Sequence, residues 1–360
     1  MSNTSVQKLD DKEFVLKLDP KGMYDLTINF PQQCRKALGI AEAADVSSAK
    51  PGSKYKNVVL TGLGGSAVGG DIVKCMFEEY AEVPFFVNRD YNLPKWVSND
   101  TLVFCTSYSG NTEETLSAYE DAKNRGSQII AVTSGGKLAE LAQKDGFPLI
   151  QIPSGQPPRT ALGFMLIPVL IAAEKLEFIP QQDYNALINL LESLLNKWNI
   201  ESSFDNNQPK QIAAKIQGKL SNIYGLGSWQ GIVANRWKGE INENAKNMAF
   251  ANTLPELNHN EVLGWVKSDS QGVQNWVTII LEDGTESAKM KARAKVTSQL
   301  ISDLAEVYTV RAEGNCLLEK IVALILFGDI MSIYLAALNG IDPENIDSIN
   351  ILKGELAKVD

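Results

Sequence analysis

The segment Asn57-Val-Val-Leu-Thr-Gly-Leu-Gly-Gly-Ser66 joins an apolar, β-branched run to a cluster of glycines, and a helical pattern follows over residues 71–80. A short apolar run that ends in glycine predicts a buried strand. Glycines at a strand-to-helix turn let the backbone turn tightly and let its N–H groups approach an anion. The segment therefore predicts a strand, a tight turn and a helix N-terminus, with Gly64, Gly65 and Ser66 as a candidate anion site. The alternative is that these glycines serve only the turn.

Strands and helices alternate after this segment. Further strands are predicted at residues 101–106, 128–133 and 148–152, with helical stretches between them at 113–124 and 137–144. Such alternation implies right-handed crossovers and a parallel, doubly wound sheet. We therefore expect an α/β domain over residues 51–180, preceded by a helical N-terminal segment over residues 1–50.

The same pattern starts again in the second half of the chain. Asn222-Ile-Tyr-Gly-Leu-Gly-Ser228 repeats the order of Leu60-Thr-Gly-Leu-Gly-Gly-Ser66, and later strands are predicted at 276–281 and 306–312. An amphipathic stretch and a polar run between the halves predict a linking helix and loop over residues 181–210. A second α/β domain is expected over residues 211–360, so that one chain holds two related domains.

Composition excludes several classes of protein. With 44% hydrophobic and 21% charged residues, the 360-residue chain is typical of a compact protein with two cores. The net charge of -9 disfavours nonspecific nucleic-acid binding. The longest apolar stretch, residues 321–338, contains Asp329 and predicts a buried helix rather than a membrane span. The polar start lacks the pattern of a signal peptide, so we expect a cytoplasmic protein with reduced cysteines.

A second candidate anion site lies in Thr106-Ser-Tyr-Ser-Gly-Asn-Thr-Glu-Glu-Thr115, directly after a predicted strand. Three hydroxyls, those of Ser107, Ser109 and Thr112, surround a turn that opens a helix, where hydrogen bonds and the helix dipole stabilise phosphate oxygens. The alternative is a helix N-cap with additional serines. The segment lacks the P-loop lysine and the GxGxxG spacing, so a small phosphorylated ligand is favoured over a nucleotide.

The single histidine of the chain lies in Glu256-Leu-Asn-His-Asn-Glu261, sixteen residues after Glu243 in Asn242-Glu-Asn-Ala-Lys246. Imidazole titrates near neutrality, so a lone histidine close to carboxylates indicates a proton carrier. The alternative for His259 is a loop residue that only makes hydrogen bonds. Four scattered cysteines and one histidine do not have the spacing of a zinc site.

Gly64-Gly-Ser66 followed by Ser107-Tyr-Ser-Gly-Asn-Thr-Glu-Glu-Thr115 resembles the phosphosugar-binding signature of sugar isomerase (SIS) domains, which are flavodoxin-like. Four further segments resemble the bifunctional phosphoglucose/phosphomannose isomerase family: Pro157-Pro-Arg-Thr-Ala-Leu-Gly163, Arg236-Trp-Lys-Gly-Glu-Ile-Asn-Glu-Asn-Ala-Lys246, Glu256-Leu-Asn-His-Asn-Glu261 and Ile351-Leu-Lys353. The resemblance implies two SIS domains and an aldose–ketose isomerase. Such an enzyme interconverts glucose 6-phosphate or mannose 6-phosphate with fructose 6-phosphate through a cis-enediolate.

The resemblance also implies which residues bind and move protons. The phosphate would be bound by Gly65, Ser66, Ser107, Ser109 and Thr112, and its binding energy would position the reacting carbons. Glu243 would take the proton from C2, since a carboxylate in a partly dry pocket has its pKa raised toward the working range. A solvated glutamate paired with Lys246 is the alternative, and Glu240, one turn earlier, is the competing base. The Asn-Glu-Asn setting favours Glu243.

Three cationic or titratable residues complete the implied site. His259 would open the sugar ring, and in the family it reaches the active site from the partner subunit, which implies a homodimer. Arg159 would face the negative charge of the enediolate, and Lys353 would assist at the ring oxygen and the C1 hydroxyl. Without the resemblance, Arg159 and Lys353 would be assigned to the surface. Proton transfer of this kind requires no metal and no organic cofactor, and neither a nucleic acid nor a membrane is an expected partner.

Two other functions remain open. A non-catalytic regulator would bind a phosphosugar through the same serines, although residues 1–50 show no clear DNA-binding helix-turn-helix. An isomerase of another phosphosugar, such as an aminosugar or pentose phosphate, would use the same base and enediolate chemistry. Exchange of the C2 proton would distinguish an isomerase from a regulator.

Overall fold

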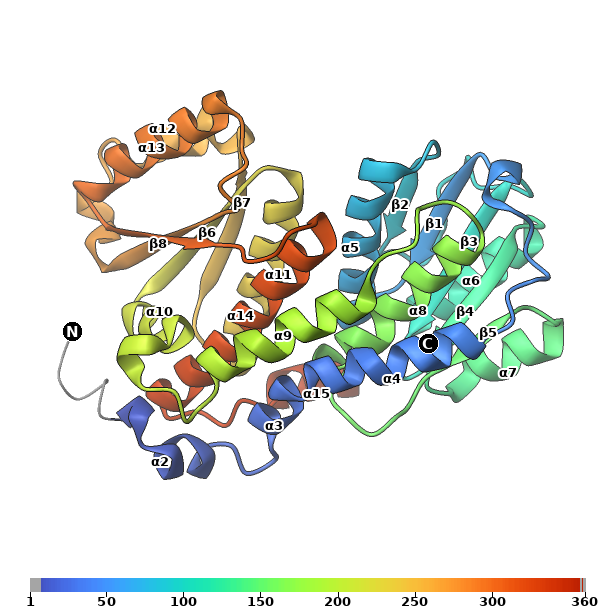
Figure 1. The fold of residues 1–360 in the computed structure, drawn as a ribbon, viewed down its shortest axis with the longest axis horizontal. Coiled ribbons are helices and arrows are strands. Elements are labelled where there is room, and N and C mark those ends of the chain that lie inside the picture. Colours follow the sequence, from blue (N-terminus) through green and yellow to red (C-terminus); the bar gives the residue numbers. More distant parts are fainter. Residues whose placement is uncertain (1–7, 357, 359–360) are drawn as a thin grey trace. The chain divides into compact units, whose positions relative to one another are not determined.

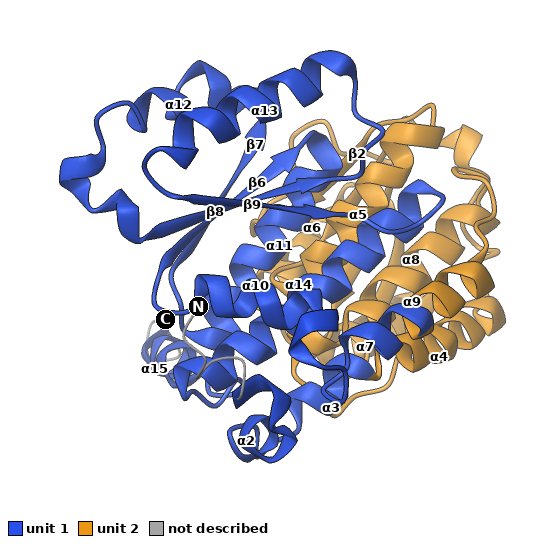
Figure 2. Cartoon of the chain, turned by 60° about the vertical axis from the view of Figure 1, so that its left-hand side comes forward, with its two compact units in different colours: residues 1–28, 193–360 blue, residues 29–192 orange. Residues whose placement is uncertain are grey.

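The computed structural model describes residues 8–356 and residue 358, and its helices and strands alternate as expected (Figure 1). By their internal contacts the residues fall into two compact units (Figure 2). Unit 2 comprises residues 29–192, and unit 1 comprises residues 1–28 and 193–360. Residues 8–28 therefore pack with the second half of the chain, whereas the helix that follows them packs with the first half.

Unit 2 contains a parallel five-stranded sheet of order β2-β1-β3-β4-β5. Its strands are β1 (Asn57–Thr61), β2 (Phe85–Asn88), β3 (Thr101–Ser107), β4 (Gln128–Thr133) and β5 (Leu149–Gln151). Its helices are α4 (Phe30–Ala43), α5 (Gly65–Tyr80), α6 (Glu113–Asn124), α7 (Gly136–Asp145) and α8 (Leu162–Lys175), and α9 (Tyr184–Trp198) continues into unit 1. This strand order is that of the flavodoxin-like doubly wound fold, which places ligands at the carboxyl ends of the strands.

Alternate strand residues of unit 2 pack on opposite faces of the sheet. Val59, Val103 and Ile129 belong to a buried cluster that also contains Tyr119 of α6 and Leu138 of α7. On the other face, α5 approaches β1 so closely that a Cβ on its Gly70 would lie 2.6 Å from the side chain of Leu60. Helices cover both faces, which explains why the central strand β3 is buried along its whole length.

Unit 1 contains a parallel four-stranded sheet of order β7-β6-β8-β9. Its strands are β6 (Leu220–Leu226), β7 (Ala249–Leu254), β8 (Trp276–Glu282) and β9 (Glu306–Arg311). Its helices are α2 (Lys12–Lys17), α3 (Met23–Ile28), α10 (Gln208–Ile216), α11 (Ser228–Ala245), α12 (Glu261–Gly264), α13 (Ala288–Ser302), α14 (Leu317–Asn339) and α15 (Asp347–Leu356). Helices α12 and α13 cover one face of this sheet, and α10, α11 and α14 lie on the other (Figure 2).

The apolar helix α14 is the centre of unit 1. It is long and apolar enough to cross a membrane, yet 94% of its most apolar window is buried inside the protein. Trp237 of α11 donates its indole N–H to the carbonyl of Leu324 at 2.8 Å and stacks on Phe327 with 5.2 Å between ring centroids. A Cβ at Gly328 would lie 2.2 Å from the same indole, so only glycine permits this contact. The prediction of a buried core helix is thus confirmed.

The fold class predicted from the sequence is confirmed, with two parallel α/β sheets in one chain. Two strands, β2 and β7, were not predicted. Both are edge strands: β2 has only four residues, and β7 reads Ala-Phe-Ala-Asn-Thr-Leu with a partly exposed middle. The apolar run of β2 is too short to stand out as a strand, and β7 lacks a continuous apolar run.

Candidate active site

The hydroxyl-rich segment of unit 2 forms a tight turn between the end of β3 at Ser107 and the start of α6 at Glu113. The Ser107 Oγ lies 2.9 Å from the Thr112 Oγ1 and accepts a hydrogen bond from the Gly110 N–H at 3.1 Å. The Asn111 N–H donates to the Ser109 Oγ at 3.2 Å. Gly110 has a φ of +72°, and a Cβ there would lie 1.8 Å from the carbonyl oxygen of Gly135. The turn therefore holds Ser107 and Thr112 side by side at the N-terminus of α6.

The Gly64–Ser66 segment joins this turn. Ser66 lies in the first turn of α5 and is 5% exposed, and its Oγ accepts a hydrogen bond from the Tyr108 N–H at 3.2 Å. Because β1 and β3 are parallel neighbours, their carboxyl ends bring the N-termini of α5 and α6 to the same edge of the sheet. Two helix N-termini and four hydroxyls therefore lie at one edge of unit 2, an arrangement suited to an anion.

Arg159 is brought to the same edge. It lies in a 3-10 turn, Pro158–Thr160, and is 7% exposed, so it is buried rather than on the surface. The turn is fixed by Gln33 and Gln156, whose side-chain amides both donate to the Thr160 carbonyl, at 2.7 and 2.8 Å. A Cβ at Gly65 would lie 2.7 Å from the Pro158 carbonyl oxygen and 3.5 Å from the Arg159 Cα. Gly65 is therefore required for the close approach of the arginine-bearing turn to α5.

Substituting Gly65 with alanine is expected to destabilise the protein by about 1–3 kcal/mol, because the new Cβ meets backbone that cannot move as a flexible side chain does. The measurement is the urea midpoint of unfolding. Gly39→Ala in α4 is the matched control, since nothing lies within 4 Å of a Cβ there and stability should rise by about 0.5–1 kcal/mol. Equal stability of the two variants would contradict the close-approach role of Gly65.

Glu243 lies in the last turn of α11 and is half-buried. Lys246, which ends the helix with a φ of +48°, donates from Nζ to the backbone carbonyls of Glu243 at 2.7 Å, Asp342 at 3.1 Å and Pro343 at 3.3 Å. These bonds tie the end of α11 to the segment between α14 and α15.

Glu240, the competing base, belongs to a buried ion-pair network. Its Oε1 pairs with Arg236 Nη1 at 2.7 Å, its Oε2 accepts from Asn244 at 2.8 Å, and it is 3% exposed. Arg236 also contacts both carboxylate oxygens of Asp329, at 3.1 and 3.0 Å. Desolvation alone would lower the pKa of Arg236, but the carboxylates of Asp329, Glu240 and Glu243 together raise it above its usual value. Glu240 is thus a structural carboxylate with both oxygens engaged.

This network was not predicted from the sequence, although two signals point to it. Arg236 and Glu240 are four residues apart on one helix, and Asp329 interrupts an otherwise apolar stretch. A charge inside an apolar helix requires a partner. Neither signal identifies the partner of Asp329, because Arg236 lies 93 residues away in the chain.

Replacing Arg236 with methionine is expected to cost about 3–5 kcal/mol of folding free energy, because it leaves two buried carboxylates without their cation. Chemical denaturation of the variant measures this cost. Lys74→Met provides the control: Lys74 forms an exposed pair with Glu78 at 3.4 Å on α5, and its loss should cost less than about 1 kcal/mol. A cost for Arg236→Met as small as that of the control would show that the network does not stabilise the fold.

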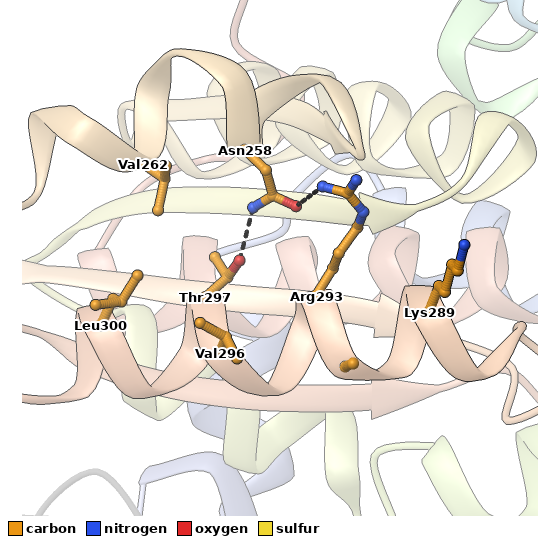
Figure 3. Close-up of a pocket in the computed structure, with 8 residues that line it drawn as sticks. Asn258, Val262, Lys289, Arg293, Val296, Thr297 and Leu300 are labelled. Atoms are coloured by element: carbon orange, nitrogen blue, oxygen red, sulfur yellow. Dashed lines mark hydrogen bonds between the residues drawn. The ribbon is translucent and has the colours of Figure 1, made fainter.

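His259 is exposed and lies at the end of a 3-10 turn, Glu256–His259, that follows β7. The neighbouring Asn258 donates to the Thr297 Oγ1 of α13 at 2.8 Å (Figure 3), and Glu261 accepts hydrogen bonds from Tyr224 and Asn252. Both carboxylate oxygens of Glu261 therefore accept hydrogen bonds from side chains of the sheet. The turn holds the imidazole on the surface of unit 1.

Within unit 1 the topology separates His259 from Glu243. Helix α11 starts at the carboxyl end of β6, and Glu243 lies fifteen residues along it, roughly 22 Å at 1.5 Å per residue. Glu243 is therefore near the amino edge of the parallel sheet, whereas His259 follows the carboxyl end of β7. Lys353 is exposed on α15, which follows the segment that Lys246 binds. The topology thus places Glu243 and His259 at opposite edges of the sheet of unit 1.

The chain is similar to known proteins over nearly its whole length. Residues 205–356 match the family model of the bacterial phospho-glucose isomerase C-terminal SIS domain, and residues 53–146 match that of the SIS domain. A bifunctional phosphoglucose/phosphomannose isomerase of Caldicellulosiruptor bescii is 40% identical, over 94% of this chain and 99% of its own. A D-glucosamine-6-phosphate 4-epimerase of Sulfolobus acidocaldarius is 30% identical, over 82% of this chain and 88% of its own.

Among solved structures, the C-terminal domain of glucosamine-fructose-6-phosphate aminotransferase from Francisella tularensis superposes with a TM-score of 0.70. It covers 93% of this chain and 98% of its own, at 14% identity, which shows a shared fold. The two sheets are therefore two SIS domains in one chain. From the identity and coverage of its relatives, the chain belongs to the bifunctional phosphoglucose/phosphomannose isomerase family.

Proposed function

We propose that the protein is an aldose–ketose isomerase that interconverts both glucose 6-phosphate and mannose 6-phosphate with fructose 6-phosphate, in the cytoplasm. The observation that carries the proposal is the meeting of two helix N-termini, four hydroxyls and a buried arginine at one edge of unit 2. This arrangement suits a phosphate ester. The relatives named phosphoglucose/phosphomannose isomerase narrow the ester to a hexose phosphate.

The proposed reaction begins with binding of the phosphate to Gly65, Ser66, Ser107, Ser109 and Thr112. His259 donates a proton to the ring oxygen and accepts one from the C1 hydroxyl, which opens the pyranose. The Glu243 carboxylate then removes the proton from C2, and the electron pair of the broken C–H bond forms the enediolate. Transfer of a proton from O2 to O1, together with return of the proton from Glu243 to C1, gives the ketose.

Two cationic side chains, those of Arg159 and Lys353, assist these steps. Arg159 stabilises the negative charge of the enediolate, and its burial supports the role because a fixed cation acts most strongly away from water. Lys353 assists at the ring oxygen and C1 hydroxyl during ring opening. A permanent guanidinium suits the first role, since it holds its charge throughout the cycle.

The hydrogen bonds and the ion pair of Glu240 support Glu243 as the base. A carboxylate with both oxygens committed to Arg236 and Asn244 has lost much of its capacity to accept a proton. Glu243, half-buried one turn later, keeps partial access to solvent.

The separation of His259 and Glu243 within unit 1 supports a homodimer in which His259 reaches the active site of the partner subunit. The exposed position of His259 fits this arrangement, because a residue that serves a neighbouring protomer must lie on the surface of its own.

Incubation with each aldose phosphate in deuterated water tests the proposal. The isomerase should exchange the C2 proton of glucose 6-phosphate and mannose 6-phosphate and form fructose 6-phosphate, as followed by proton NMR. A phosphosugar-binding regulator would bind both sugars and leave the C2 proton intact, which would refute the enzymatic proposal.

A second candidate function is chemistry on another phosphosugar. The relative named D-glucosamine-6-phosphate 4-epimerase favours this second function, because its sequence, like those of the isomerases, is similar to this chain over most of its length. The same NMR assay with glucosamine 6-phosphate would show inversion at C4 if this function applies. Turnover of that sugar above the turnover of both hexose phosphates would replace the first proposal by this one.

A further inference from the structure

Tyr108 contacts two separate segments of unit 2. It is the first residue after β3, in the hydroxyl-rich turn, and it is 7% exposed. Its N–H donates to the Ser66 Oγ at 3.2 Å, and its carbonyl accepts from the N–H and the hydroxyl of Ser134, at 3.1 and 2.7 Å. Its phenolic oxygen accepts from the Gln156 N–H at 3.2 Å. The main chain of Tyr108 is therefore part of the proposed phosphate site, whereas its hydroxyl contacts the loop that leads to Arg159.

Gln156 in turn contacts the 3-10 turn that carries Arg159. The Gln156 Nε2 donates to the Thr160 carbonyl at 2.8 Å. Within the turn, the N–H and the hydroxyl of Thr160 both donate to the Pro157 carbonyl, at 3.0 and 2.9 Å. The main chain is thus held by hydrogen bonds on both sides of Arg159.

Gln33 of α4 is a second anchor of the same turn. It is 4% exposed, its Nε2 donates to the Thr160 carbonyl at 2.7 Å, and its Oε1 accepts from the Gly163 N–H at 2.6 Å. The Thr160 carbonyl therefore accepts two side-chain amides, which uses both of its lone pairs. One amide comes from α4, and the other comes from Gln156, whose own N–H is bound to Tyr108.

These bonds form a continuous path from the proposed phosphate site to the arginine. The path runs from Ser66 through Tyr108 and Gln156 to Thr160, next to Arg159. An arginine side chain has several rotatable bonds, so its guanidinium is placed accurately only when its main chain and its surroundings are fixed. Accuracy matters because a displacement of about 1 Å at a reacting centre can cost roughly 100-fold in rate.

We infer that Tyr108 is a positioning residue, whose hydroxyl fixes the Arg159 turn relative to the groups that bind the phosphate. A sugar held by its phosphate then presents its reacting carbons to the guanidinium. The inference rests on the proposed function, in which Arg159 stabilises the enediolate. Loss of the Tyr108 hydroxyl should therefore weaken binding of the transition state more than binding of the substrate.

Tyr108→Phe tests the inference, because it removes the phenolic oxygen and keeps the ring and the main-chain bonds. It should lower kcat for both aldose phosphates ~10-fold and leave KM within about twofold. Tyr119→Phe is the matched control. Tyr119 is also a buried tyrosine of unit 2, and its hydroxyl donates to Asp145 at 2.9 Å, at the end of α7 that is remote from the candidate site. The control loses one hydroxyl bond as well, but its kcat should be nearly unchanged.

Calorimetry with two ligands separates positioning from a loss of structure. Fructose 6-phosphate is a substrate, whereas 5-phospho-D-arabinonate carries a carboxylate in place of the enediolate. Tyr108→Phe should weaken binding of the arabinonate ~10-fold and of fructose 6-phosphate less than about twofold. Gln156→Ala, at a half-buried position, interrupts the same path and should show the same difference. It decides the inference if Tyr108→Phe does not fold.

A double-mutant cycle shows whether the effect passes through the arginine. Arg159→Met should itself weaken binding of 5-phospho-D-arabinonate, since it removes the cation that faces the carboxylate. In the Arg159→Met background, Tyr108→Phe should then cause little further loss, because its effect depends on the guanidinium. Additive losses would overturn the inference, and so would unchanged affinities or an equal loss for both ligands in Tyr108→Phe.

Turnover by the wild type is scored separately from these affinities. A wild-type protein that exchanges no C2 proton would refute the proposed function, whereas the cycle of arabinonate affinities would still show whether Tyr108 positions Arg159. Normal isomerisation by the wild type, with additive losses in the cycle, would refute the positioning role alone.

Discussion

Glu243→Gln is expected to lower kcat for both aldose phosphates by about 10³-fold or more, because the amide cannot take the C2 proton that the carboxylate removes. Fructose 6-phosphate should bind with nearly unchanged affinity, since the groups proposed to bind the phosphate lie in unit 2. Stopped assays of product and NMR of C2 exchange give the loss of turnover, and calorimetry gives the affinity. Loss of exchange together with intact binding would identify Glu243 as a proton carrier.

Two further substitutions separate this role from a general effect of charge. Glu240→Gln should chiefly lower stability, because it weakens the ion pair with buried Arg236 at 2.7 Å. Glu256→Gln, which changes an exposed glutamate near His259, should leave kcat within about twofold. Near-normal turnover by Glu243→Gln, with a large loss of kcat in Glu240→Gln, would transfer the role of base to Glu240.

The sequence is sufficient to predict the fold where one local pattern determines the structure. The central strands β3, β4 and β8 are largely apolar runs, and each is found within one residue of its predicted bounds. Helix α5, by contrast, begins at Gly65 rather than near Asp71. Its glycine-rich first turn has little helical propensity, and the parallel sheet and the adjoining turn determine its start instead.

Polar long-range contacts are harder to predict than strands. The Arg236–Asp329 pair joins residues 93 positions apart, and no periodicity specifies which cation meets a given buried acid. The burial of Arg159 is equally hard to predict from the sequence. The loop sequence indicates an exposed residue, but the packing of Pro158 on Gly65 buries Arg159 in the protein. Such placements follow from the order of the strands, which brings separate loops to one sheet edge.

The sequence and the structure of a single chain do not determine which subunit supplies His259 to the active site. Residues 243 and 259 are near neighbours in the sequence, which favours a shared site in one chain. The direction of α11 opposes this, because Glu243 is carried roughly 22 Å from the carboxyl edge of the sheet where the His259 turn begins. Proximity in sequence is therefore a poor guide when a whole helix and a strand lie between two residues.

Heterodimers isolated through two affinity tags are expected to resolve this question. A site that takes Glu243 from one chain and His259 from the other is intact once in a dimer of a Glu243→Gln chain with a His259→Ala chain. Such a dimer should have about half the wild-type kcat, although each parent dimer is nearly inactive. The reaction is assayed with the cyclic aldose phosphates, for which ring opening by His259 is required.

The complementary heterodimer should give the opposite result. A chain with both substitutions, paired with a wild-type chain, leaves no site with an intact glutamate and an intact histidine when the two residues come from different chains. It should therefore be nearly inactive, whereas sites built within one chain would keep about half of the activity. Because the two pairings carry the same two substitutions in the same dose, a difference in their kcat can arise only from which chain supplies His259. Half activity in this second dimer and none in the first would place both residues in one protomer.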